Sequence, residues 1–176
     1  MMRGNWWRRV LVPAAIRLDR LHEVIQAAMG WQNCHVHAFT AADASYGRPE
    51  RELGHRDERQ VRLSDLVGVT GSLAYEYDFG DGWEHQLYVE VALPAEADRR
   101  YPACVAGAGA CPPEDCGGPW GYQDLKEVIA DPARDEHEPM LGWLGLETAA
   151  DFDATHFDVA AADQRLAMLG TDEPAW

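Results

Sequence analysis

The sequence predicts an α+β fold: a mostly antiparallel sheet with a central β-hairpin and with helices packed on one side of it. Stretches that alternate like strands cluster before residue 94, and stretches with helical spacing follow, with one further helix inserted early. At 176 residues the chain is long enough to bury a core without disulfides. We therefore expect a single domain over residues 1–170 and a loose C-terminal tail over residues 171–176.

The early part of the chain carries a strand, a helix and a second strand. "RRVLVPAA" predicts a short strand that ends at Pro13. "LDRLHEVIQAAMG" predicts a helix, because its apolar residues recur at intervals of three and four and Gly30 stands where a C-terminal cap belongs. "CHVHAFT" alternates, which predicts a strand that places His35, His37 and Phe39 on one face.

The central hairpin comes from "SLAYEYDFGDGWEHQLYVEVAL". Its register depends on loop length, because a slip of one residue sends every side chain to the opposite face. A two-residue turn would oppose apolar residues to polar ones, whereas a three-residue Gly80-Asp81-Gly82 loop gathers the apolar side chains on one face. We expect the three-residue loop, with Gly82 in the left-handed conformation. The expected pairs are Phe79 with Trp83, Tyr77 with His85, and Tyr75 with Leu87.

The remaining segments are connectors and helices. Residues 41–60 are polar and predict an excursion over the surface, and "VRLSDLVGV" predicts a short strand followed by a helical turn that Ser64 caps. A polar connector spans residues 94–102. Helical patterns then appear in "YQDLKEVIADP", "EHEPMLGWLG" and "FDVAAADQRLAMLG".

The charge of the chain disfavours nucleic acid as a partner. The net charge is −15, and from Cys111 to the C-terminus fifteen acids face three bases. Nucleic-acid binding depends on neutralising phosphates, which an acidic surface opposes. Only the first twenty residues, with five arginines and one acid, offer a basic segment.

No segment is apolar enough to cross a membrane, and the start, "MMRGNWWRRV", lacks the apolar stretch of a signal peptide. The sequence therefore predicts no membrane partner and a cytoplasmic location, where thiols stay reduced. The sequence lacks a phosphate-binding P-loop and the motifs G-x-G-x-x-G and G-x-S-x-G. The common signatures of nucleotide-binding proteins and hydrolases therefore do not indicate a function for this chain.

Three cysteines form the first candidate metal site. Cys104, Cys111 and Cys116 are spaced C-x6-C-x4-C around the Pro- and Gly-rich loop "CPPEDCGGPWGY", and zinc accepts three thiolates and one histidine. His85 is the fourth ligand that we expect. The spacing lacks the tight C-x2-C that is typical of zinc motifs, so two alternatives stay open. The thiols could pack as small apolar groups, or a Cys104–Cys111 or Cys111–Cys116 disulfide could form.

Histidines and acids near the hairpin form a second candidate, a metal-dependent enzyme. His35 and His37 share a predicted strand face, and His85, Asp78 or Asp81 could complete a ligand set. The alternative is that these histidines are hydrogen-bonded core residues. In the expected register Asp78 would also oppose Glu84, and a carboxylate pair of this kind can carry out acid–base chemistry.

Three motifs resemble those of the plasmid pRiA4b ORF-3-like family. "LHEVIQAAMGWQNCHVHAF", "YEYDFGDGWEH" and "CPPEDCGGPWGY" occur in that order, and the likeness runs from about Trp7 to about Leu169. The resemblance implies a bacterial or archaeal source and an association with plasmids and mobile elements. From that context, nucleic-acid handling for a mobile element is a third functional hypothesis, although the charge opposes it.

The resemblance also implies an extended segment before Trp7, where this chain has only "MMRGNW". Either the start is assigned too late or the sheet lacks a strand. In the second case a neighbouring strand is left as an open edge, and we expect either homodimer contacts or a loosely held strand there.

The leading hypothesis is a binding or interaction module. Its site lies where the "FGDGWEH" hairpin meets the cysteine loop, with aromatic walls and an acidic rim that receive a small molecule or a protein. The predicted ligand-binding residues are Trp83, His85, Glu114, Asp115, Trp120 and Tyr122. The alternative is that Trp83, Trp120 and Tyr122 form a small hydrophobic core that holds the cysteine loop against the sheet.

Overall fold

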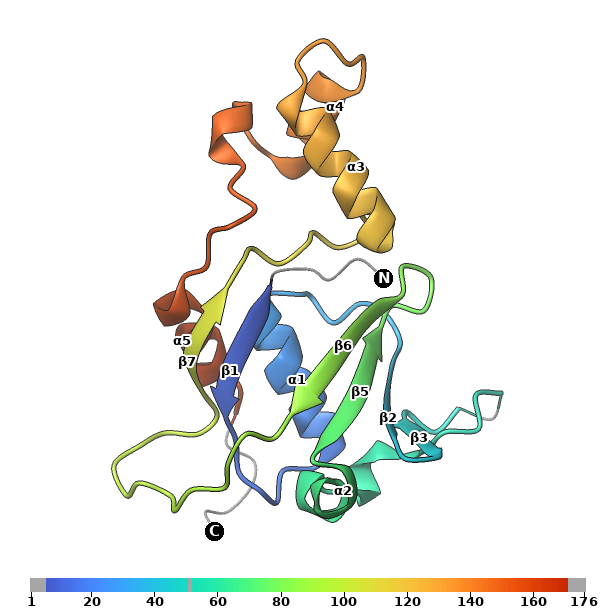
Figure 1. The fold of residues 1–176 in the computed structure, drawn as a ribbon, viewed down its shortest axis with the longest axis vertical. Coiled ribbons are helices and arrows are strands. Elements are labelled where there is room, and N and C mark those ends of the chain that lie inside the picture. The colour runs from blue at the N-terminus through green and yellow to red at the C-terminus, as the bar shows by residue number, and fades with distance from the viewer. Residues whose placement is uncertain (1–5, 51, 171–176) are drawn as a thin grey trace.

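The computed structural model describes residues 6–50 and 52–170 (Figure 1). Their helices are α1 (Leu18–Met29), α2 (Leu63–Thr70), α3 (Gly118–Ala130), α4 (His137–Leu144) and α5 (Val159–Ala167), with short 3-10 turns η1 (Glu58–Gln60) and η2 (Ala149–Asp151). Their strands are β1 (Trp7–Leu11), β2 (His37–Ala41), β3 (Ala44–Gly47), β4 (Arg56–Asp57), β5 (Ser72–Tyr77), β6 (Trp83–Tyr88) and β7 (Ala103–Ala108).

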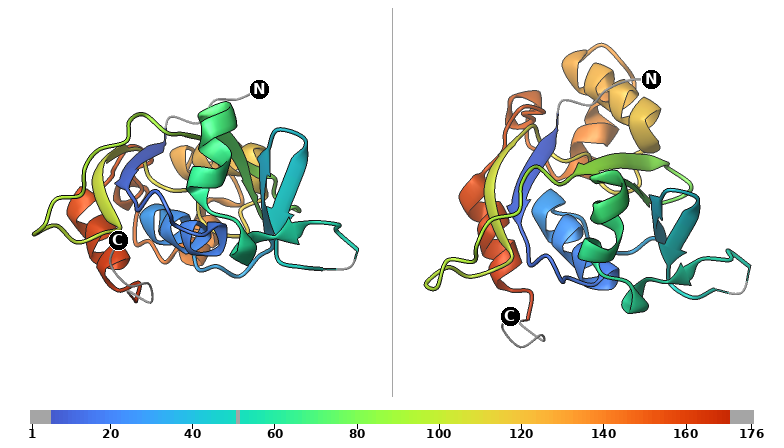
Figure 2. Two further views of the ribbon diagram at one scale, coloured as in Figure 1. Left: turned by 90° about the horizontal axis from the view of Figure 1, so that it is seen from below. Right: turned by 60° about the horizontal axis from the view of Figure 1, so that its bottom comes forward.

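The strands form two sheets, and the fold is α+β as the sequence predicts. One sheet has the order β4-β3-β2-β5-β6, and all its pairings are antiparallel except that of β3 with β4. The other is the antiparallel pair of β1 and β7. Helix α1 lies behind β1 and β6 in Figure 1, and α5 packs against both α1 and β7. Helices α3 and α4 pack together beyond one end of the strands (Figures 1 and 2).

Helix α1 supplies much of the core and confirms the helical pattern of "LDRLHEVIQAAMG". Leu18, Leu21 and Ile25 are buried in the central cluster, together with Phe39 of β2. Gly30 ends the helix with a positive φ of 97°, and its N–H donates to the Gln26 carbonyl. The chain can therefore turn sharply toward residues 31–36, which lie beside the candidate site.

The hairpin corrects the predicted loop length. Tyr77 pairs with Trp83, Tyr75 with His85 and Leu73 with Leu87, so the loop has five residues, not three. The observed strand pairing differs from the predicted register by two residues. Because side chains alternate between faces with a period of two, the apolar side chains still share one face. Gly82 has the expected positive φ of 67°.

The residue that lengthens the loop is Asp78. It leaves the strand with a φ of 56°, and its Oδ1 accepts hydrogen bonds from the N–H groups of Gly80 and Asp81. This side-chain turn begins the loop before Phe79 can pair. The carboxylate that opposes Glu84 across the strands is consequently that of Glu76, and the predicted pairing of Asp78 with Glu84 was wrong.

Other differences concern short elements. The polar stretch 41–60 is not only a surface excursion, because it contains β3, β4 and the buried Glu58. Helix α2 begins at Leu63, and the Asp65 carboxylate, rather than Ser64, accepts from the Arg62 N–H. Strand β7 was not predicted, and it places Cys104 in a strand. Within the described residues, no helix is long and apolar enough to span a membrane.

Two predictions fall wholly or partly outside the described residues. The C-terminal tail, residues 171–176, is one of them. The segment before Trp6 is the other, and so the homodimer through an open edge stays a prediction. In the part of the chain that the structure describes, β1 pairs with β7 alone, and β6 ends the five-stranded sheet.

Candidate functional site

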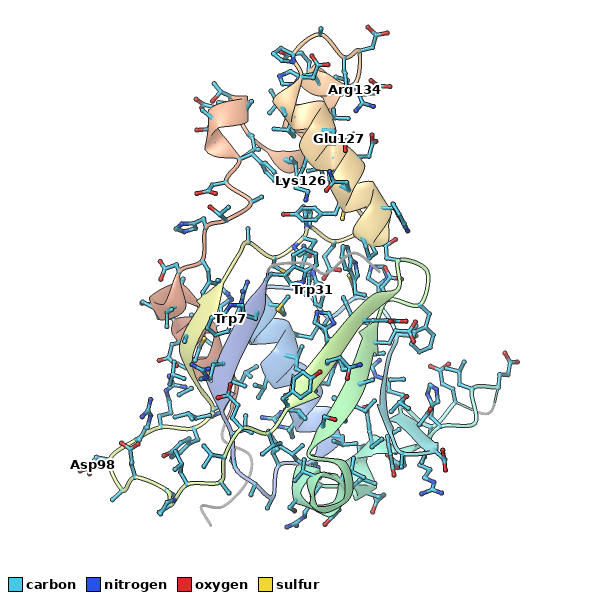
Figure 3. All side chains as sticks on the ribbon, in the orientation of Figure 1. Trp7, Trp31, Asp98, Lys126, Glu127 and Arg134 are labelled. Carbon is cyan, nitrogen blue, oxygen red and sulfur yellow. The ribbon has the colours of Figure 1, made fainter. Side chains whose placement is uncertain are left out.

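The hairpin loop and the cysteine loop are in direct contact. The Asp81 carboxylate accepts a hydrogen bond from the Gly117 N–H at 3.1 Å, and the Trp31 indole N–H donates to the Pro112 carbonyl at 3.0 Å. Gly118 lies so close to the hairpin that a Cβ on it would stand 2.1 Å from the Asp81 carbonyl oxygen. Trp31 also contacts the rings of Tyr77 and Trp83, near the end of β6 that faces α3 (Figure 3).

The aromatic residues of the predicted site are mostly core residues. Trp83 and Tyr122 are each 3% exposed, and the ring of Trp6 lies between them with edge-on contacts of 6.2 and 5.7 Å. Trp120, by contrast, is 76% exposed on α3. The aromatic side chains thus fasten the loop to the sheet and leave only Trp120 for a ligand to meet.

His85 is also a packing residue in this structure. Its ring lies edge-on to Trp31, and its Nδ1 is 3.1 Å from the Trp83 carbonyl oxygen. Burial lowers the pKa of this imidazole, which favours its neutral form. Its Nε2 is buried without a hydrogen-bond partner among the described residues.

The thiols do not assemble the predicted metal site. All four cysteines are free, and no group of three or more ligand atoms within 4.8 Å of one another contains Cys104, Cys111 or Cys116 in the described chain. Burial raises the pKa of the Cys111 and Cys116 thiols to about 12, so both stay protonated near neutral pH. The thiol of Cys104 points at the Ala106 carbonyl within β7, at 3.7 Å.

A different set of ligand atoms meets at the junction, around His35. The His35 Nε2 atom lies 3.1 Å from Asp115 Oδ1, 3.6 Å from Asp78 Oδ2 and 3.8 Å from Glu114 Oε2. This nitrogen is buried, yet none of these contacts has the alignment of a hydrogen bond. Cys34 adds a sulfur within 4.8 Å of the ligand atoms of His35 and Glu114. We call these five residues the His35 cluster.

In two carboxylates of the His35 cluster, one oxygen accepts hydrogen bonds from the protein and the other oxygen faces His35. Asp78 Oδ1 accepts the two N–H bonds of its turn, and its Oδ2 faces His35. Glu114 Oε1 accepts from the Gln32 N–H at 2.7 Å and from the Tyr77 hydroxyl at 3.1 Å, and its Oε2 faces His35. Such second contacts fix the direction of a ligand oxygen before any ion arrives.

Tyr77 links the parts of the His35 cluster. Its hydroxyl donates to Glu114 and accepts from the Cys34 N–H at 3.1 Å, and the Cys34 sulfur lies 3.8 Å away. Burial, followed by the contact with Cys34, raises the pKa of this phenol, so it remains a neutral donor. The sequence gives no sign of this role, because Tyr77 reads only as a core residue of the strand.

His37 does not join His35. It lies at the start of β2, with its Nε2 2.7 Å from the buried Glu58 carboxylate, and its ring stacks on that of His22 at 3.4 Å. Asp81 does not join His35 either, because its carboxylate accepts a hydrogen bond from the Gly117 N–H. Of the residues predicted for a metal-dependent site, the structure brings together His35 and Asp78, and it adds Glu114 and Asp115 from the predicted binding rim.

Comparison with known proteins identifies relatives. The profile of the family described as "Plasmid pRiA4b ORF-3-like protein" matches residues 2–161. The chain is 48% identical over 151 residues to "Uncharacterized protein y4hQ" of Sinorhizobium fredii (strain NBRC 101917 / NGR234). The aligned region covers 84% of this chain and 76% of that protein. The crystal structure of MM3350 from Methanosarcina mazei Go1, a protein of unknown function, is similar with a TM-score of 0.79 and 35% identity, over 88% of each chain.

Proposed function

Since the chain belongs to the plasmid pRiA4b ORF-3-like family, and the names of its matched relatives state no activity, we propose a function from the site itself. The protein is a divalent-metal-binding module. A zinc-like ion binds His35 and the carboxylates of Asp78, Glu114 and Asp115, where the hairpin meets the cysteine loop.

The observation that carries this proposal is the buried His35 Nε2 facing three carboxylate oxygens without a hydrogen bond. Their distances from the nitrogen are 3.1, 3.6 and 3.8 Å. Ligand bonds of about 2.0 to 2.1 Å around a tetrahedral ion separate neighbouring ligand atoms by about 3.3 Å. The ligand atoms of His35, Asp78 and Asp115 all lie within 4.8 Å of one another, as do those of Cys34, His35 and Glu114, so two overlapping ligand sets share the His35 imidazole. A divalent cation would offset the repulsion among the carboxylates.

The mixture of ligand atoms indicates the class of metal. One imidazole nitrogen with carboxylate oxygens suits zinc and the neighbouring divalent transition metals, whereas magnesium and calcium prefer oxygen ligands alone. Of the carboxylates, Asp115 has a side chain that is 69% exposed, while those of Asp78 and Glu114 are mostly buried. The ion would consequently have one side open to solvent, where a water, a small molecule or a protein side chain can bind.

Isothermal titration of chelator-treated protein with Zn²⁺ tests the proposal. We expect one Zn²⁺ site per chain. We expect His35→Gln and Asp78→Asn each to weaken Zn²⁺ binding by about 100-fold or more, because loss of a ligand should exceed the roughly 10- to 100-fold loss caused by removing a residue that only orients a ligand. Asp78→Asn keeps the Oδ1 acceptor that forms the loop turn, so it removes charge without removing the turn. His156→Gln is the control, because His156 is exposed and lies outside the cluster.

The proposal fails if the wild-type protein shows no saturable Zn²⁺ binding. It also fails if the two cluster variants bind as tightly as the control. Circular dichroism of each variant shows whether the fold is retained, so that lost binding is not confused with unfolding.

A further inference from the structure

A polar pocket of about 340 Å³ lies between α1 and the segment that carries β3, β4 and η1. Its lining includes His22 and His37, but none of the carboxylates of the His35 cluster. The volume is at the lower end of small-molecule sites and suits a metabolite rather than a peptide. This pocket is separate from the proposed metal site, and its occupant does not depend on that proposal.

The floor of the pocket is formed by the buried, hydrogen-bonded side chains of His22 and His37. The rings of His22 and His37 stack with an angle of 5° between their planes. Asn33 Oδ1 can only accept, so the His22 Nε2 at 2.7 Å carries the proton, and His22 Nδ1 accepts from the Tyr75 hydroxyl. Glu58, beside His37, is 4% exposed. The Asn33 amide nitrogen is left without a hydrogen-bond partner among the described residues.

The two walls of the pocket carry opposite charges. Asp19 and Glu23 line it from α1, and Arg48 and Arg59 line it from the opposite segment. In the described chain neither arginine forms an ion pair with an acid of α1: Arg59 binds the neighbouring Asp57, and Arg48 has no ion pair. The acids of α1 are themselves paired along the helix: Arg17 binds both carboxylate oxygens of Asp19, and Arg20 binds Oε2 of Glu23. Arg48, Glu58 and the second oxygen of Glu23 are therefore the charged groups that a ligand in the pocket would meet.

We propose that this pocket binds a small zwitterion of the α-amino acid class. The ligand's carboxylate contacts Arg48 and the Asn33 amide, and its ammonium group lies toward Glu23 and Glu58. A guanidinium suits a carboxylate because it presents several N–H donors in one plane.

Ligands with a single charge fit the pocket less well. A simple anion would gain the contact with Arg48 but would also face Glu23 and Glu58, and a simple amine would face the two arginines. Repulsion between like charges excludes the wrong ligand, just as attraction between opposite charges favours the right one. The arrangement therefore selects for both charges in one short molecule.

Two-dimensional ¹H–¹⁵N NMR titration tests the inference, with each of the twenty common free amino acids as the probe. We expect at least one to cause saturable shifts at Asn33, His37 and Glu58. For that amino acid, we expect the analogue without the amino group and the analogue without the carboxylate each to bind at least about tenfold more weakly.

Arg48→Gln supplies the matched variant, because Arg48 is exposed and has no ion pair to lose. We expect this change to weaken binding of the same amino acid by about tenfold. Arg134→Gln is the control, since Arg134 lies near α4 at the far end of the molecule (Figure 3). Absence of saturable shifts with all twenty probes overturns the inference, as does equal binding of a singly charged analogue or of the Arg48 variant.

Discussion

The chemistry of the His35 cluster depends on carboxylates whose two oxygens make different contacts. Asp78 and Glu114 each use one oxygen for the fold and direct the other at His35. This division requires Asp78 to adopt a φ of 56°, a conformation that non-glycine residues rarely take. Backbone strain of this kind is retained where the surroundings enforce it, and here the two N–H bonds to its carboxylate do so.

Tyr77→Phe tests whether the cluster is prearranged. The change removes the hydroxyl that donates to Glu114 and accepts from Cys34. We expect the free energy of unfolding to fall by about 1 to 3 kcal/mol, because buried partners lose a hydrogen bond. We also expect Zn²⁺ affinity to fall by about 10- to 100-fold, as for other groups that orient a ligand.

Urea unfolding and Zn²⁺ titration measure the two effects of this change. Tyr88→Phe is the control, because Tyr88 is 71% exposed and lies outside the cluster. If Tyr77→Phe lowers stability but leaves Zn²⁺ affinity at the control value, Tyr77 is only a structural residue and Glu114 is not prearranged through it.

Among the elements, the contact between the hairpin loop and the start of α3 positions the cluster. Gly118→Ala would place a Cβ against the Asp81 carbonyl and would strain a backbone with a φ of 69°. We expect a loss of about 2 to 4 kcal/mol in the free energy of unfolding. Zn²⁺ affinity should fall with it, because the loop that carries Glu114 and Asp115 is displaced.

Gly142→Ala in α4 is the matched control for Gly118→Ala, since nothing lies within 4 Å of the added carbon and its φ is not positive. It should be neutral or stabilising by up to about 1 kcal/mol. Thermal unfolding and Zn²⁺ titration compare the two variants. Equal stability of both would show that the close approach at Asp81 does not hold the loop in place.

The elements also show how far the sequence could predict the site. Alternation identified the shared apolar face of β5 and β6, because a displacement of two residues preserves it. Alternation could not give the loop length, which depends on Asp78 taking the left-handed conformation. Strand β7, "ACVAGA", went unnoticed because its small residues lack the bulk that marks most strands. The contact of the two loops was predicted, but only the folded backbone brings Cys34 into the cluster and places Tyr77 against it.

Over the whole molecule, a continuous polar network crosses the core and makes stability depend on pH. Gln26 Nε2 donates to the Tyr75 hydroxyl, which donates to His22, which in turn donates to Asn33. These bonds join α1, β5 and the turn after α1. Burial, and then the neighbouring His37, lower the pKa of His22 from its ordinary value of 6.5 to about 3.

This displaced pKa predicts how the molecule responds to acid. Between about pH 6.5 and pH 3 the unfolded chain binds a proton at His22 that the folded chain does not, so stability falls as the pH falls through this range. The contribution of His22 is complete above pH 6.5 and its loss reaches about 4 to 5 kcal/mol near pH 3. Urea unfolding at several pH values should therefore show a shallower decline for His22→Gln than for the wild type. Equal slopes in both proteins would contradict a buried neutral His22, and His156→Gln, at an exposed position, should keep the wild-type slope.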